Sequence, residues 1–283
     1  MGAAVDGRLY VMGGFTSAKL DVTARVDRYD PTTDSWTQLA DGPGAETHAG
    51  VARNGSGLLL LGGFRGWPGT ATAEAHRYDA TTDTYARLPD LGGARAALAV
   101  AILDGRAHAV GGLAADGNSD SDEHEVLDLA QPDGAAAWVR ATPLPGPRNH
   151  LGGAAIAGKL AVVGGRHRWD ENTSNQATLS LFDPATNTWT AGASLPLARS
   201  EIAAATFTDG ARVVVIGGSV NPMKPSRDAL VYDPTTDAWT ALPPLPVPLK
   251  GAVADVIGDT VYVTTGSPTG TAPGAATYAG CCF

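Results

Sequence analysis

The chain has only two cysteines among 283 residues, and these are the adjacent Cys281 and Cys282. Adjacent cysteines close a disulfide only through a strained ring, so the sequence predicts two free thiols near its end and no structural disulfide. No run of 18 consecutive apolar residues occurs, so no membrane-spanning helix is expected. The first residues, MGAAVDG, lack a basic segment followed by an apolar core, so no signal peptide is predicted.

Charged residues are also scarce, at 17% of the chain, whereas hydrophobic residues make up 43%. Disordered chains combine high charge with little apolar content, so this composition predicts a folded protein. The formal net charge is −9. Nucleic-acid binding usually requires a basic surface, so a nucleic-acid partner is not expected.

Glycine is abundant, with 36 copies, and much of it is periodic. Five hydrophobic runs end in a glycine doublet: RLYVMGG, GLLLLGG, RAHAVGG, KLAVVGG and RVVVIGG, with doublets that begin at residues 13, 62, 111, 164 and 217. A sixth, degraded copy reads TVYVTTG and ends at Gly266. A period of about 40–50 residues is typical of a propeller array. The sequence therefore predicts one domain over 1–283 with six blades, at approximately 1–40, 47–89, 96–144, 151–196, 201–246 and 251–283.

Each unit contains segments for four strands, A to D, of which strand B ends in the glycine doublet. Strand C ends in an aromatic or leucine residue followed by aspartate, at Tyr29, Tyr78, Leu127, Phe182 and Tyr232. Strand D carries Trp36, Tyr85, Trp138, Trp189 or Trp239. A four-stranded blade cannot bury both faces alone, so blades stack around an axis and share apolar faces. The doublet permits positive φ and close approach of a neighbouring backbone.

The glycine doublet, a Tyr-Asp-Pro and a tryptophan about seven residues after that tyrosine form a combination that resembles the kelch repeat. The resemblance extends over nearly the whole chain and implies an all-β, six-bladed kelch-type β-propeller. The last unit has candidate strands near 251–257, 260–265 and 275–279 but no tryptophan-bearing fourth strand. Kelch propellers usually close their ring with a strand from the other terminus, and no donor strand is evident. The last blade is therefore expected to be incomplete or to close atypically.

The B–C loops and the D–A links between blades are expected on one face. This face holds half of the 20 basic residues, so it is comparatively basic on an acidic protein. Charge gathered at a mouth attracts anionic ligands, although ordinary solvated loop charge explains the same pattern. The residues are Lys19, Arg65, Arg95, Arg148, Arg166, Arg168, Arg199, Lys224, Arg227 and Lys250.

The D–A links lead into the innermost strands, so their side chains are expected to ring the axial opening. His150 and Glu201 are candidate acid–base groups there. Arginine and lysine side chains at such a mouth suit a carboxylate or phosphate. The ligand-binding candidates in the links are Arg148, Asn149, His150, Arg199, Glu201 and Lys250. Arginines at these links also have a structural interpretation, in which they pack and bond to neighbouring loops.

Two B–C loops carry tryptophan, at Trp67 and Trp169. An exposed tryptophan beside polar groups suits stacking on a sugar or anchoring of a protein partner, and packing over its own loop is the structural alternative. A third B–C loop places oxygen side chains at alternate positions, as in the start of a calcium loop, and predicts either a calcium site or a mobile acidic loop. Its candidate ligands are Asp116, Asn118, Asp120 and Asp122. A calcium site would favour a secreted or extracytoplasmic bacterial protein.

Two functions remain open. The first is a monomeric recognition propeller that binds a glycan, a protein or a small anionic molecule on the loop face. The second is an enzyme with mutarotase-, isomerase- or lyase-like acid–base chemistry at the axial mouth. The loop GGSVNPMKPSRDAL is similar to a loop of sialic acid mutarotases and keeps Arg227, but Ser219 stands where that family has a glutamate.

Overall fold

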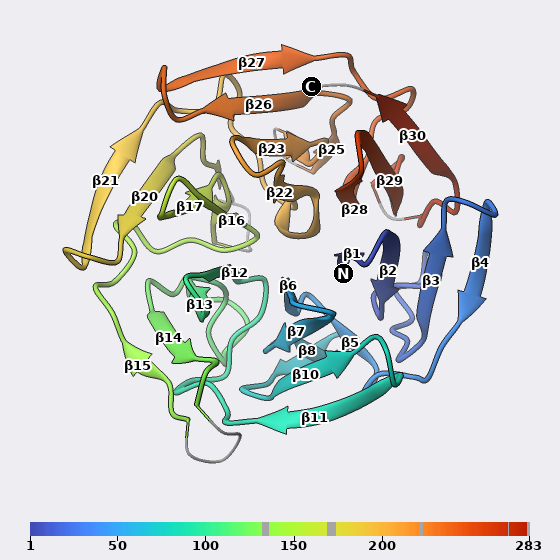
Figure 1. The fold of residues 1–283 in the computed structure, drawn as a ribbon, viewed down its shortest axis with the longest axis horizontal. Helices are drawn as coiled ribbons and strands as arrows, with labels where there is room; N and C mark the ends of the chain where they lie inside the picture. The colour runs from blue at the N-terminus through green and yellow to red at the C-terminus, as the bar shows by residue number, and fades with distance from the viewer. Residues whose placement is uncertain (132–135, 169–173, 221–222, 271, 282–283) are drawn as a thin grey trace.

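The computed structural model describes residues 1–131, 136–168, 174–220, 223–270 and 272–281. Its main sheets stand around a central axis like the blades of a propeller (Figure 1). The prediction of an all-β kelch-type propeller is confirmed, since the one helix among these residues is the short 3-10 helix η1 (Ala203–Ala205). No helix in the described part of the chain has the length and apolarity needed to cross a membrane.

The first three blades are antiparallel sheets of four strands, ordered from the axis to the rim. Blade 1 contains β1 (Gly2–Val5), β2 (Arg8–Met12), β3 (Val26–Asp30) and β4 (Ser35–Gln38). Blade 2 contains β6 (Gly50–Asn54), β7 (Gly57–Leu61), β10 (Ala75–Asp79) and β11 (Thr84–Leu88). Blade 3 contains β12 (Ala99–Leu103), β13 (Arg106–Val110), β14 (His124–Asp128) and β15 (Val139–Arg140).

Blades 4 and 5 repeat this order, whereas the described part of blade 6 has three strands. Blade 4 contains β16 (Gly152–Ile156), β17 (Lys159–Val163), β20 (Leu179–Asp183) and β21 (Thr188–Gly192). Blade 5 contains β22 (Thr206–Thr208), β23 (Val213–Ile216), β26 (Ala229–Asp233) and β27 (Ala238–Leu242). Blade 6 contains β28 (Lys250–Ile257), β29 (Thr260–Ser267) and β30 (Thr277–Cys281). The expected absence of a tryptophan-bearing strand in the last unit thus agrees with its three-stranded sheet.

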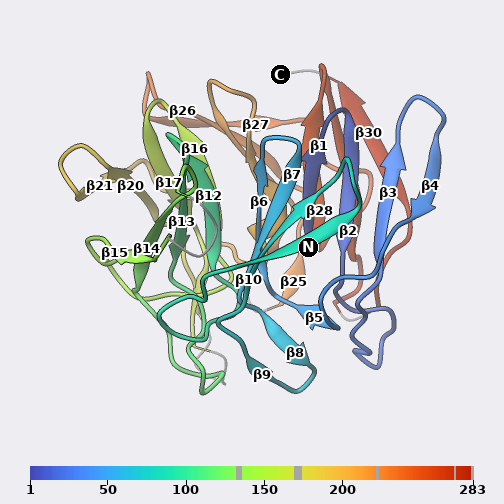
Figure 2. The ribbon, with the colours of Figure 1, turned by 60° about the horizontal axis from the view of Figure 1, so that its bottom comes forward.

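Short extra strands decorate the face that carries the B–C loops and D–A links. Figure 2 shows β8 and β9 projecting beyond the blades on this side. These strands form three small sheets, in which β5 (Glu46–Thr47), β8 (Phe64–Gly66) and β9 (Gly69–Ala71) pair together, β18 (Arg166–His167) pairs with β19 (Ser174–Asn175), and β24 (Ser219–Val220) pairs with β25 (Lys224–Pro225).

The apolar core is divided among the spaces between neighbouring blades. Leu59 and Leu61 of blade 2 pack with Leu98 and Val100 of blade 3, for example. A separate cluster joins blade 6 to blade 1 and contains Ala4, Leu9, Tyr29 and Val253. Each blade therefore depends on its neighbours to remove its apolar faces from water.

The glycine doublets bind each blade to the next through the backbone. Gly63 donates its N–H to the carbonyl of Arg95, in the link that enters blade 3, at 2.8 Å. Gly62 has φ near +62°, and a Cβ on it would lie 2.2 Å from the same carbonyl oxygen. The second glycine of four other doublets makes the equivalent bond: Gly14 to Glu46, Gly112 to Arg148, Gly165 to Arg199 and Gly218 to Leu249.

At the rim, a pair of side chains on one blade holds the backbone N–H and the carbonyl of one residue that lies just after strand D of the preceding blade. Asp237 accepts the N–H of Ala193 at 2.7 Å, and the indole of Trp239 donates to the carbonyl of Ala193 at 2.7 Å. Asn187 and Trp189 hold both groups of Thr142 in the same way, at 3.0 and 2.9 Å. We call this pair the inter-blade clamp.

Candidate binding site at the axial mouth

A cavity of about 770 Å³ opens where the D–A links meet around the axis. Five residues at equivalent positions in five blades line it, each two residues beyond the carbonyl that a doublet glycine contacts. They are His48, Ala97, His150, Glu201 and Gly251. The side chains of His150 and Glu201 therefore lie at the axial opening, where the sequence placed them.

These five residues form a chain of backbone hydrogen bonds around the mouth. Ala97 donates to His48, His150 to Ala97, Glu201 to His150 and Gly251 to Glu201, at 2.7 to 3.1 Å. All five have φ between +53° and +61°, a conformation that costs about 1 kcal/mol or more for a residue other than glycine. Residues held in this way by their surroundings cluster at binding and catalytic sites. This series of backbone hydrogen bonds thus fixes the directions of the side chains at the mouth.

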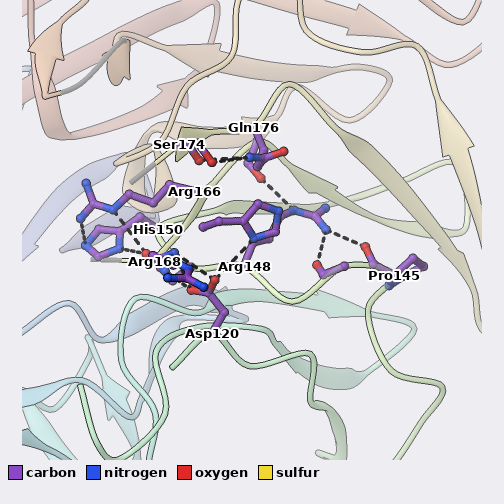
Figure 3. Close-up of polar contacts among 12 residues, drawn as sticks. Asp120, Pro145, Arg148, His150, Arg166, Arg168, Ser174 and Gln176 are labelled. Carbon is purple, nitrogen blue, oxygen red and sulfur yellow. Dashed lines mark hydrogen bonds and ion pairs between the residues drawn. The ribbon is translucent and has the colours of Figure 1, made fainter. Parts of the chain in front are cut away.

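Arg166 joins the polar groups of the cavity wall (Figure 3). Its Nη1 donates to Oε1 of Glu201 at 3.0 Å, and its Nη2 donates to Nε2 of His150 at 2.9 Å. His150 in turn donates from Nδ1 to Oδ1 of Asn149 at 2.5 Å. Asn149 bonds to Asp120 through its amide nitrogen, so blade 3 contributes to the same network. Both ring nitrogens of His150 are therefore engaged by protein groups.

Burial and neighbouring charge set the protonation of this network. Burial, reinforced by Arg166, holds the pKa of His150 well below its ordinary value, and burial lowers the pKa of His48 to about 4. Burial alone would raise the pKa of Glu201, but Arg166 and Lys250 together hold it below its usual value. At neutral pH the two histidines are neutral, Glu201 is an anion, and Arg166 and Lys250 are cations.

Lys250 is a basic group of this wall with few protein partners among the described residues. Its residue is 5% exposed, and it lines the cavity. Its Nζ lies 3.8 Å from Oε1 of Glu201, and no hydrogen bond from this ammonium to any described residue occurs. Burial lowers the pKa of Lys250, and Glu201 partly opposes that shift. The ammonium of Lys250, with three donors, thus faces the cavity.

The opposite part of the mouth is aromatic. The rings of His48 and Trp67 are stacked, with centroids 5.4 Å apart and an interplanar angle of 23°. Phe15 and Phe64 contact Trp67 edge-on, each at 5.6 Å. Phe15, His48 and Trp67 line the cavity. Trp67 therefore packs in a small aromatic cluster at the mouth, and its role in binding a sugar or a protein stays a prediction.

Arg148 and Arg199 do not line the cavity. Arg148 donates to the carbonyls of Pro145, Gly146 and Gly164, and Figure 3 shows its side chain turned toward Pro145. Arg199 donates to the carbonyl of Gly217 at 2.9 Å and pairs with Asp228. Burial lowers the pKa of Arg148 to about 10. Their guanidinium groups thus hold the link and the glycine doublet of one blade together, as the structural interpretation proposed.

Two more sequence candidates lie apart from the mouth or outside the described residues. Arg227 is exposed and donates from Nε to the carbonyl of Leu245 at 2.6 Å, away from the cavity lining. Trp169 falls outside the described residues.

The carboxylates of the candidate calcium loop point in different directions. Asp116 accepts bonds from the backbone N–H groups of Asn118 and Ser119 and so closes its own turn. Asp120 turns to blade 4, where it accepts the N–H of Arg168 at 3.0 Å. Asp122 is exposed. Among the described residues no group of three or more metal-ligating side chains converges.

Arg166 is the central residue of this network, and the sequence placed it only among the basic residues of the loop face, not among the ligand-binding candidates in the links. It follows a glycine doublet, at a position where four other blades have Phe15, Phe64, Leu113 and Ser219. Arg166 could have been found from the sequence as an arginine at a position where the other blades have none. Arg95, Arg148 and Arg199, in contrast, recur at one repeat position.

Known proteins share this repeat. The model of the kelch motif matches residues 2–43 and 203–246. Kelch-like protein terF of Aspergillus terreus is 30% identical over 136 residues, which cover 46% of this chain and 30% of that protein. Kelch-like protein 35 of Mus musculus is 28% identical over 183 residues, covering 65% of this chain and 29% of that protein. Kelch-like ECH-associated protein 1B of Danio rerio is 32% identical over 85 residues, or 30% of this chain and 14% of that protein.

The chain thus spans about 30% or less of the length of these curated relatives. All three organisms are eukaryotes, and the secreted bacterial origin expected from the acidic loop stays a prediction. The matched motifs lie in blades 1 and 5, the same doublets and strands recur in the sheets between them, and blade 4 repeats the clamp. The chain belongs to the kelch-repeat family.

Proposed function

We propose that this propeller is a recognition module that binds a segment of a partner protein at its axial mouth. The observation that carries the proposal is Lys250, a largely buried lysine that lines the cavity and whose nearest acidic group among the described residues is Glu201, at 3.8 Å. Water in the cavity can solvate this ammonium, and a ligand carboxylate would replace that water with direct, charge-assisted hydrogen bonds. The partner segment therefore presents a carboxylate, from an acidic side chain or a chain terminus.

The other half of the cavity favours an apolar group beside that carboxylate. Phe15 and Trp67 supply an aromatic wall, and the volume of about 770 Å³ lies within the range of small-ligand pockets. A pocket of this size accommodates a few side chains. A short acidic segment with an adjacent apolar residue fits both halves.

A protein partner is favoured over a glycan by the packing of Trp67. Sugar stacking uses an open ring face, but His48 already stacks on Trp67. The zebrafish relative is named for its association with another protein, which supports the same choice. The acid–base alternative gains little support, because both nitrogens of His150 and the carboxylate of Glu201 bond to neighbouring side chains.

Selection from a phage library of random linear peptides tests the proposal. We expect the peptides that bind the wild-type chain to be enriched in an acidic residue next to an apolar one. Peptides selected in parallel on the Lys250→Met variant should lack that acidic preference. Enriched peptides without acidic residues, or a library with no binders, would refute the proposed carboxylate anchor.

A further inference from the structure

Met223 is a methionine that the fold places at the surface of the axial mouth. The chain has three methionines, and Met12 is buried in the core at 1% exposure. Met223, in contrast, is 41% exposed and lines the cavity. The thioether of Met223 is therefore accessible both to solvent and to any ligand that enters the mouth.

The backbone around Met223 holds this side chain in place. Met223 directly precedes β25 and has φ near +68°, which is unfavourable for a residue with a long side chain. β25 pairs with β24, the strand that follows the glycine doublet of blade 5. A left-handed residue of this kind persists only where the surrounding structure imposes it, so the hairpin sets the position of Met223 at the mouth.

The sulfur of Met223 contacts the guanidinium at the centre of the polar network. Nη1 of Arg166 donates to Sδ of Met223 at 3.2 Å, and the same nitrogen donates to Oε1 of Glu201 at 3.0 Å. Arg166 is 1% exposed, so the thioether is one of the groups that cover its charge. Thioether sulfur is a weak hydrogen-bond acceptor. An oxygen atom in the same place would therefore be a better partner for the guanidinium.

We propose that Met223 is an oxidation site whose sulfoxide weakens the binding of carboxylate ligands at the axial mouth, an effect on binding that rests on the proposed function. The oxidant is a peroxide. The sulfur lone pair attacks one oxygen of hydrogen peroxide, the O–O bond breaks and an S–O bond forms. The departing hydroxide takes up the proton of the transferred oxygen and leaves as water. The sulfur loses the two electrons that the peroxide gains.

The sulfoxide oxygen changes the wall of the mouth in two ways. It bonds to Nη1 of Arg166 in place of the thioether sulfur, and it converts an apolar side chain into a polar one. It also brings partial negative charge to the contacts that include Lys250, whose Nζ lies 3.8 Å from the same Oε1 of Glu201. This charge repels a ligand carboxylate at Lys250, so we expect the affinity for an acidic peptide to fall about tenfold.

Treatment of the full chain with hydrogen peroxide, followed by mass spectrometry of its proteolytic peptides, tests the oxidation site. We expect Met223 to gain one oxygen atom at a rate close to that of free methionine. Met12, which is 1% exposed, should react at least about tenfold more slowly. Equal rates of oxidation at Met223 and Met12 would overturn the inference.

The magnetic resonance signal of the Arg166 side-chain N–H groups tests the contact without any ligand, and the Arg166→Lys variant identifies that signal by its loss. Oxidation should shift the signal in the wild-type chain and leave it unchanged in Met223→Leu. This matched control keeps the apolar bulk but lacks the sulfur, and it retains Met1, which also lines the cavity. A signal that stays in place in the oxidised wild-type chain, or moves equally in Met223→Leu, contradicts the inference.

The affinity for an acidic peptide selected on the untreated chain tests the effect on binding. Oxidation should weaken this affinity about tenfold in the wild-type chain and leave it unchanged in Met223→Leu, and methionine sulfoxide reductases should restore it. If the oxidised wild-type chain binds the peptide as tightly as the untreated chain, the inference is wrong and the proposed function stands. If the untreated chain binds no acidic peptide, the proposed function is wrong and the effect on binding falls with it. The oxidation of Met223 and its contact with Arg166 are then decided by the first two measurements.

Discussion

The carboxylate of Asp255 accepts the backbone N–H of Ala4, with Oδ2 2.7 Å from the nitrogen. Asp255 lies in the inner strand of blade 6, and Ala4 lies in the inner strand of blade 1. The bond therefore joins the first and last blades near the axis, where the ring has no covalent connection. Both residues are buried, Asp255 at 8% exposure and Ala4 at 2%.

Replacement of Asp255 by alanine should lower the free energy of unfolding by about 2 kcal/mol, because a buried donor loses its acceptor. Guanidinium denaturation measures the change. Asp259→Ala is the control, since Asp259 is exposed on the turn between β28 and β29. Equal stability of the two variants would show that the Asp255 bond does not hold the ring closed.

Replacement of Gly62 by alanine should lower the free energy of unfolding far more than replacement of Gly55 by alanine. Both glycines have positive φ, near +62° and +57°, so both alanine variants are strained by about 1 kcal/mol. Only Gly62 places the new Cβ against a carbonyl oxygen, that of Arg95 at 2.2 Å, whereas Gly55 has nothing within 4 Å. We expect Gly62→Ala to lose at least about 2 kcal/mol more than Gly55→Ala in thermal or denaturant unfolding. Similar losses would contradict the role assigned to the doublets.

Arg148→Lys should destabilise the fold by about 2–4 kcal/mol, although it keeps the positive charge. The guanidinium of Arg148 donates to three carbonyls and to the hydroxyl of Ser180, and one ammonium cannot reach four separated acceptors. Denaturant unfolding measures the loss. Affinity for a peptide selected at the axial mouth should stay unchanged at temperatures where the variant is folded. A weaker affinity with unchanged stability would return Arg148 to the ligand-binding candidates.

The protein should lose stability as the pH falls from about 6.5 to about 4. His108 and His124 are buried and hydrogen-bonded to one another at 2.9 Å, and burial lowers the pKa of each to about 4. The unfolded chain binds protons at these groups near pH 6.5, whereas the folded chain does not, so acid favours unfolding. Between about pH 7.5 and pH 5 each histidine should lower the free energy of unfolding by about 2 kcal/mol.

The double variant His108→Leu/His124→Leu checks this origin of the acid sensitivity. Replacement of both partners by apolar groups removes the titration without leaving a buried histidine unpaired. The carbonyl of Thr142, which accepts from His124, keeps its bond from Trp189. The free energy of unfolding should therefore depend less steeply on pH in the variant. An unchanged slope between about pH 6.5 and pH 4 would assign the effect to other groups.

The repeat itself made the fold predictable, because doublets, strand C aromatics and strand D tryptophans recur at nearly even spacing. The same recurrence explains why the site was only partly predictable. Arg148 and Arg199 were site candidates by residue type, yet both bond to glycine-doublet carbonyls of the repeat. The informative positions are those that depart from the repeat, such as Arg166. Lys250 is another, because the equivalent residues are Thr47, Ala96, Asn149 and Ser200.

The clamp positions of blade 1, Asp34 and Trp36, make no hydrogen bond to blade 6 within the described residues, which fits the predicted lack of a tryptophan-bearing fourth strand in the last unit. Asp34 and Trp36 match the repeat as well as the filled pairs do. Their state depends on what the neighbouring blade supplies, and this is a property of the ring.

The most direct test of the proposed function is a calorimetric titration of one selected acidic peptide into the wild-type chain and three variants. Lys250→Met and Trp67→Ala should each weaken binding about tenfold or more, because one removes the ammonium and the other the aromatic wall. Lys159→Met removes a lysine at the start of β17, outside the cavity lining, and should leave the affinity unchanged. If Lys250→Met binds the peptide as tightly as the wild-type chain, the axial cavity is not the carboxylate site and the account is wrong.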